Sequence, residues 1–71
     1  MHLYIRVNTK GRFYIQARDT DGYRGGVGNP FGYYQEYEAV SVAEKFRKDA
    51  DDSILPGQSV HIYGSTGRRV S

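Results

Sequence analysis

Apolar and polar residues alternate in two stretches near the start of the chain, and this period of two predicts two β-strands. Apolar residues occupy positions 3, 5 and 7 in the first stretch and positions 13, 15 and 17 in the second. Between them, Asn8-Thr9-Lys10-Gly11 has the composition of a tight turn. The sequence therefore predicts a β-hairpin with one buried face.

A different period follows, in which apolar residues recur every three or four positions from Ala39 to Ile54. This spacing predicts an amphipathic helix. We expect it to begin near Tyr37, although a capping box at residues 41–44 offers a second start at residue 42. Pro56-Gly57 is expected to end it.

After the helix, Val60 and Ile62 alternate with polar residues and predict another strand. Residues 64–67 can turn the chain, and residues 68–70 can return as a short edge strand. Residues 22–32 hold five glycines and show no periodicity, so they predict a long loop, with a short strand possible within residues 31–35.

These elements predict one α+β domain over residues 1–71, with a Gly/Tyr-rich loop insertion at residues 19–35. We expect a three- to four-stranded antiparallel sheet with one helix packed on one face, in the order ββαββ. The helix is expected to cover the apolar strand residues, which are Leu3, Ile5, Val7, Phe13, Ile15, Val60 and Ile62.

The closing segment, Val60-His61-Ile62-Tyr63-Gly64-Ser65-Thr66-Gly67-Arg68-Arg69-Val70, follows the predicted hairpin and helix. In this order the chain resembles small uncharacterised bacterial and phage proteins of ββαββ type, in which a strand–turn–Gly–Arg–strand segment follows the helix. The resemblance implies the order of the elements and implies no activity. Relative to that family, the glycine-rich loop looks like an insertion.

Charge is distributed unevenly along these elements. Residues 1–35 hold five basic and two acidic side chains, whereas residues 36–59 hold three basic and six acidic ones. Residues 60–71 add two arginines. The strands are therefore basic and the helix is acidic, although the net charge is only +2.

Seven tyrosines among 71 residues point to binding, because a tyrosine ring needs cover while its hydroxyl needs a polar partner. They fall into two predicted surfaces. The sheet surface carries aromatic and basic residues on the outward strand face, namely Tyr4, Arg6, Arg12, Tyr14, Arg18, His61 and Tyr63, with Gln16 among them. The loop surface consists of Tyr23, Arg24, Phe31, Tyr33, Tyr34 and Tyr37.

Other chemistry finds little support in the sequence. Asp19-Thr20-Asp21-Gly22 starts like a calcium loop, but its glycine comes two places early and the closing glutamate is missing. The glycine loop matches neither the dinucleotide fingerprint nor the phosphate loop. One internal histidine, His61, supports no catalytic triad. We therefore expect no enzyme, no metal and no cofactor.

The sequence predicts a non-enzymatic binding module. Our main expectation is a small protein-interaction or inhibitor protein of bacterial or phage type that binds its partner through the loop surface. The alternative is single-stranded nucleic acid or RNA binding through the sheet surface, which ordinary cross-strand pairing would also explain. Edge pairing into a homodimer stays open. A cytoplasmic location is expected, because residues 1–4 do not resemble a signal peptide and no segment is long and apolar enough to span a membrane.

Overall fold

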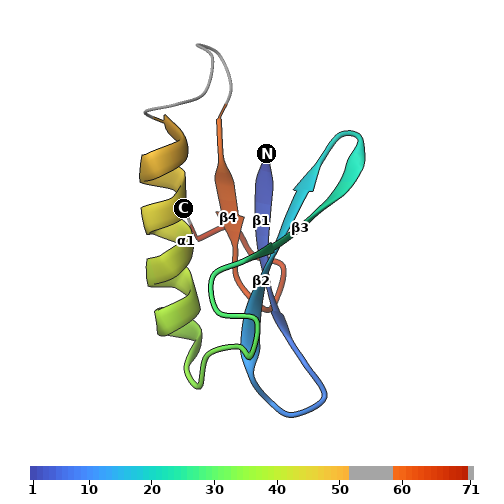
Figure 1. Ribbon diagram of the computed structural model, residues 1–71, viewed down its shortest axis with the longest axis vertical. Helices are drawn as coiled ribbons and strands as arrows, with labels where there is room; N and C mark the ends of the chain where they lie inside the picture. The colour runs from blue at the N-terminus through green and yellow to red at the C-terminus, as the bar shows by residue number, and fades with distance from the viewer. Residues whose placement is uncertain (52–58, 71) are drawn as a thin grey trace.

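The computed structural model describes residues 1–51 and 59–70, with the side chains of residues 24 and 51 left aside. Its strands are β1 (His2–Val7), β2 (Phe13–Asp19), β3 (Gly22–Val27) and β4 (His61–Tyr63), and its helix is α1 (Glu36–Asp51). The four strands form one sheet in the order β3-β2-β1-β4, and α1 packs along one side of it (Figure 1). The predicted α+β class is confirmed.

The sheet is mixed, so the expectation of an antiparallel sheet is wrong. β1 pairs antiparallel with β2, and β2 pairs antiparallel with β3, as in the predicted hairpin and its extension. β4, however, lies parallel to β1 at the other edge. Parallel strands need a long crossover connection. Here α1 provides it, since the chain leaves β3, runs through the helix and returns at the opposite edge of the sheet as β4, with β2 and β1 in between.

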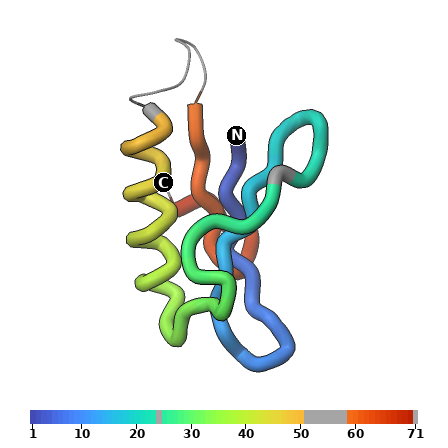
Figure 2. Tube along the Cα trace, in the orientation of Figure 1, coloured from blue at the N-terminus to red at the C-terminus, as the bar shows by residue number. Residues whose placement is uncertain are grey.

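A second correction concerns residues 22–27, which form β3 rather than the first half of a loop. Their glycines obscure any alternation of side chains. The backbone nevertheless pairs with β2, with Gly26 opposite Gln16 and an irregularity in the register between Ala17 and Arg18. The loop is shorter than expected and comprises residues 28–35, which run from the end of β3 to the start of α1 (Figure 2). Within it, one bridge joins Tyr33 to Phe13.

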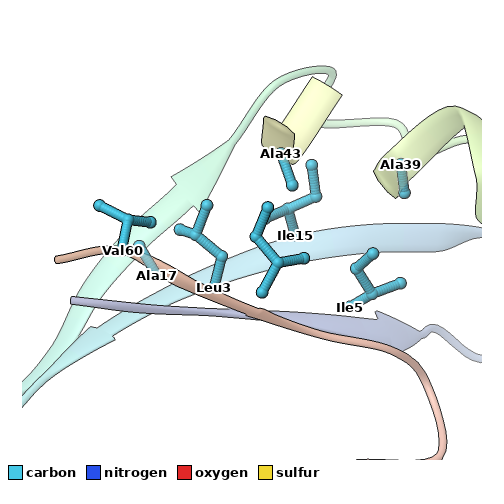
Figure 3. Close-up of a cluster of buried hydrophobic side chains, with 8 residues drawn as sticks. Leu3, Ile5, Ile15, Ala17, Ala39, Ala43 and Val60 are labelled. Atoms are coloured by element: carbon cyan, nitrogen blue, oxygen red, sulfur yellow. The ribbon is translucent and has the colours of Figure 1, made fainter. Parts of the chain in front are cut away.

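The core lies between α1 and the inner face of the sheet (Figure 3). Ala39 and Ala43 are completely buried, and their small side chains let the helix approach the strands closely. The buried apolar residues are Leu3, Ile5, Ile15, Ala17, Ala39, Ala43, Val60 and Ile62. Two expected core positions differ: Phe13 is only partly buried, and Val7, at the end of β1, is 51% exposed because the helix contacts do not reach it.

The helix begins at Glu36, close to the expected start, so the alternative start at residue 42 is wrong. Glu36 has a structural task as well. Its Oε1 accepts a 2.9 Å hydrogen bond from the Ser65 backbone N–H, and its Oε2 accepts one of 3.2 Å from Ser65 Oγ. These bonds tie the start of α1 to the turn after β4. The expected helix end, and with it Ile54 and Pro56-Gly57, lies outside the described residues.

The predicted edge strand at residues 68–70 is reduced to a single antiparallel bridge between Arg69 and Tyr63. Gly64 N–H donates to the Arg68 carbonyl at 2.8 Å, and Val70 N–H donates to the Ile62 carbonyl at 2.9 Å. The chain therefore does turn back beside β4, as the turn residues predicted. Within residues 1–51 and 59–70, no helix has both the length and the apolar character needed to cross a membrane.

Candidate functional site

The sheet face opposite α1, here called the outer face, collects the aromatic and basic side chains of the strands. Strand alternation places them there, because the residues between them are buried under the helix. Its members are His2, Tyr4 and Arg6 of β1, Tyr14, Gln16 and Arg18 of β2, Tyr23 and Gly26 of β3, and His61 and Tyr63 of β4. None of these residues is acidic.

Four of these rings form a contiguous cluster over β1 and β4, the ring cluster: His2, Tyr4, His61 and Tyr63. The rings of Tyr4 and Tyr63 stack with centroids 4.8 Å apart, which matches the spacing of neighbouring strands. His2 stacks on His61 at 5.4 Å, and a 3.0 Å hydrogen bond joins His2 Nδ1 to Tyr63 Oη. The Arg6 guanidinium carbon lies 5.0 Å from the centre of the Tyr4 ring.

Basic groups from β1, from α1 and from the segment after β4 influence the ring of His61. Burial lowers the pKa of its ring from the ordinary value of 6.5, with further contributions from Arg69, His2, the N-terminal amine and Arg47. Ser59 Oγ lies 3.1 Å from His61 Nε2. The opposite nitrogen, Nδ1, is buried without a hydrogen-bond partner among the described residues. Within residues 1–51 and 59–70, no group orients the imidazole of this pair as in a catalytic triad.

The lowered pKa predicts how stability depends on pH. Because the folded protein binds a proton at His61 less readily than the unfolded chain, the contribution of this group is complete above pH 6.5 and is lost as the pH falls through the folded pKa. We expect the denaturation midpoint to decrease over this acid range in the wild type, and to decrease less in His61→Gln. Urea titrations at a series of pH values measure this, and parallel curves for the two proteins would contradict it.

At the other side of the outer face, a groove of about 520 Å³ lies over β2 and β3. Tyr14 and Tyr23 are among its lining residues, together with Gly26, which has only backbone to contribute. Asn8, from the hairpin turn, and Asn29, from the loop after β3, also line it. This volume is typical of sites that bind small organic groups.

The predicted loop surface does not act as one unit. Tyr33 is partly buried, packs against the core and accepts a 2.8 Å hydrogen bond at Oη from the Asn29 N–H, so its role is structural. Tyr23 lines the groove of the outer face. Phe31 and Tyr37 remain strongly exposed, at 76% and 69%. The side chain of Arg24 lies outside the described part of the chain.

The position of Arg12 also differs from the prediction. It was expected on the sheet surface, but it precedes β2, and its guanidinium carbon lies 4.4 Å from the centre of the Tyr34 ring. Its Nη2 donates a 3.0 Å hydrogen bond to Tyr34 Oη. This pair links the hairpin turn to the loop of residues 28–35. The other predicted sheet-surface residues, Tyr4, Arg6, Tyr14, Arg18, His61 and Tyr63, do share the outer face.

Sequence reasoning missed His2, Gly26 and the two asparagines of the groove. His2 is two positions before Tyr4, so the strand period already placed it beside the tyrosine. Gly26 and Asn29 had no such signal, because β3 was not recognised. For metals, no cluster of three or more His, Cys, Asp or Glu residues exists among the residues that the structure describes.

Comparison with known proteins adds no further assignment. No protein-family model, no curated protein and no solved structure matches this chain, so its resemblance to ββαββ proteins of bacteria and phages stays a prediction.

Proposed function

We propose that this protein is a non-enzymatic module that binds single-stranded nucleic acid through the outer face of its sheet. One observation carries the proposal: this face combines aromatic rings with arginines, and none of its described residues carries a carboxylate. Six of the eight acidic residues lie in residues 36–59, mainly in α1 on the other side of the sheet. The fold therefore concentrates the carboxylates on the side of the sheet away from the outer face, although α1 also carries three basic residues.

Each component of the face suits a part of a nucleic acid strand. Bases stack on aromatic rings in any sequence, and tyrosine rings are present over both halves of the sheet, at Tyr4 and Tyr63 and at Tyr14 and Tyr23. Arginines bind phosphates, and Arg6 and Arg18 lie on the same face as these rings. A strand crossing the face would meet rings and cations without meeting a negative charge.

The test is binding of a fluorescent oligonucleotide of about 12 nucleotides, a length within the range of known single-strand sites. We expect Tyr14→Leu, which keeps apolar bulk but removes the ring, to weaken binding by about 1–3 kcal/mol, or about 5- to 150-fold. Arg6→Gln is expected to weaken binding and to reduce the salt dependence by about 0.7 in the slope of log K against log salt concentration. Fluorescence anisotropy at several salt concentrations measures both effects.

Phe31→Ser is the matched control, because Phe31 is an exposed aromatic outside the outer face. Its binding is expected to equal that of the wild type, and thermal melting of each variant confirms folding. An oligonucleotide that does not bind even at about 20 mM salt, where phosphate contacts are strongest, would refute the proposal.

The exposure of Phe31, Tyr34 and Tyr37 favours a second candidate, a protein partner bound beside the start of α1. Exposed aromatic side chains are frequent anchors of protein interfaces. The same variants distinguish the two functions. If capture of a host protein survives nuclease treatment and is lost in Phe31→Ser but not in Tyr14→Leu, the protein partner replaces nucleic acid as the proposed function.

A further inference from the structure

Gly26 lines the groove over β2 and β3, and its lack of a side chain leaves this part of the groove unfilled. Its φ is not positive, unlike those of Gly25 and Gly28, so its backbone conformation is open to other residues. A Cβ at this position would meet only the Ile15 carbonyl oxygen, at an ordinary 3.8 Å. Glycine inside a strand costs roughly 0.5–1 kcal/mol relative to alanine. Folding does not require glycine here, whereas close approach of a ligand does.

Gly28 shows the contrast. Its φ is +82°, and a Cβ there would come within 3.0 Å of the Val42 side chain and closer still to Tyr33 Oη. Packing and backbone conformation both demand glycine at position 28. Neither demands it at position 26, where a side chain would project over the groove.

The two asparagines of the groove are held by their carbonyl oxygens. Asn8 Oδ1 accepts the N–H groups of Lys10 and Arg12 at 2.9 and 3.0 Å. Asn29 Oδ1 accepts the N–H of Phe31 at 2.9 Å. Their NH₂ groups have no hydrogen-bond partner among the described residues. Each of these two lining residues therefore has a fixed side-chain amide with two unused N–H donors.

We propose that this groove holds one unpaired base of a bound strand and that it prefers thymine or uracil to cytosine; this inference rests on the proposed function. Tyr14 and Tyr23 supply the stacking surfaces, and the absence of side chain at Gly26 lets a flat ring lie on the sheet. Among the described residues that line the groove none is charged, which suits a neutral base, while Arg18 beside Tyr23 can bind the phosphate outside it.

The donors set the preference. Thymine and uracil present two carbonyl oxygens, each of which accepts from an asparagine NH₂ group. Cytosine replaces one of these acceptors with an amino donor, which would face another donor and lose its hydrogen bond. A lost hydrogen bond of this kind costs about 1–3 kcal/mol. We therefore expect thymine to be preferred by about 5- to 150-fold.

The experiment compares labelled oligothymidylate and oligocytidylate of about 12 nucleotides on the wild type, Gly26→Val and Thr9→Val. Wild type and Thr9→Val, which replaces a hydroxyl with a methyl group in the hairpin turn, are expected to prefer oligothymidylate. Gly26→Val is expected to fill the groove and bind both oligonucleotides equally, with an unchanged or raised melting temperature. In NMR spectra, oligothymidylate should shift the side-chain NH₂ signals of Asn8 and Asn29 in the wild type and in Thr9→Val, but not in Gly26→Val.

The outcomes separate this inference from the function on which it rests. If the wild type binds neither oligonucleotide, the proposed function fails. If it binds both without preference, or if Gly26→Val keeps the preference, the strand is bound elsewhere on the outer face and the inference about the groove is wrong. Shifts confined to the ring cluster, without the asparagine signals, would overturn it in the same way.

Discussion

Ile5→Ala is expected to lower the free energy of unfolding by about 2–5 kcal/mol and to leave a large fraction of the protein unfolded at room temperature. Ile5 has no exposed surface, lies in β1, one of the two internal strands, and belongs to the core that packs against α1. Removing its side chain loses buried apolar surface and leaves a cavity. A chain of 71 residues buries only a modest share of its surface on folding, so little stability remains to offset this loss.

Val7→Ala is the matched control for this prediction. Val7 lies two positions further along the same strand face, but it is 51% exposed. We expect its loss of stability to be well under half that of Ile5→Ala. Urea denaturation followed by circular dichroism measures both. Losses of stability of similar size would contradict the observation that Ile5 belongs to the core and Val7 does not.

Gly28→Ala is expected to destabilise the protein by at least about 1–2 kcal/mol, the cost of a left-handed conformation for a residue with a Cβ. Steric clashes of the new Cβ add to this cost. The new Cβ would displace Tyr33 Oη, which accepts the Asn29 N–H, and would press on Val42 of α1. We therefore expect the loop of residues 28–35 to lose its attachment as well. Thermal melting measures the stability, and hydrogen exchange at Asn29 measures the attachment.

Gly26→Ala provides the comparison two residues earlier. Since its φ suits any residue and its Cβ meets ordinary space, we expect no loss, or a gain of about 0.4–1 kcal/mol from the reduced freedom of the unfolded chain. A loss equal to that of Gly28→Ala would show that position 26 also needs glycine for folding. It would thereby remove the reason to assign this glycine to a ligand.

The local periods of the sequence predicted the elements that bury one continuous apolar face. The hairpin follows from the alternation around Gly11, and the pairing of Ile5 with Ile15 brings two predicted core residues together. The stripe through Ala39 and Ala43 predicted both the helix and its buried side. β3 was not predicted because three of its six residues are glycines, which leave no alternation of apolar and polar side chains in the sequence. Its pairing with β2 depends on backbone hydrogen bonds instead.

The candidate site was predictable to a similar degree. Alternation alone placed Tyr4, Tyr14 and Tyr63 on the face away from the helix, and the structure confirms that they share it. The alternation did not show which tyrosines stabilise the fold. Tyr33 holds the loop to the core, and Tyr34 is bound to Arg12, through contacts between residues distant in sequence. Such contacts depend on where the loop crosses, which no local pattern encodes.

By itself the sequence determined one amphipathic helix, a hairpin, a further strand after the helix and a basic, tyrosine-bearing strand face, because each depends on the spacing of neighbouring residues. Tertiary structure alone decided that β4 lies parallel to β1, so that His61 and Tyr63 join His2 and Tyr4 in the ring cluster. It also decided that β3 exposes bare backbone beside Tyr14. Both outcomes depend on which strands become neighbours in the sheet. The order of strands along the chain does not fix this, because the strand arrangement is selected by burial of the whole core.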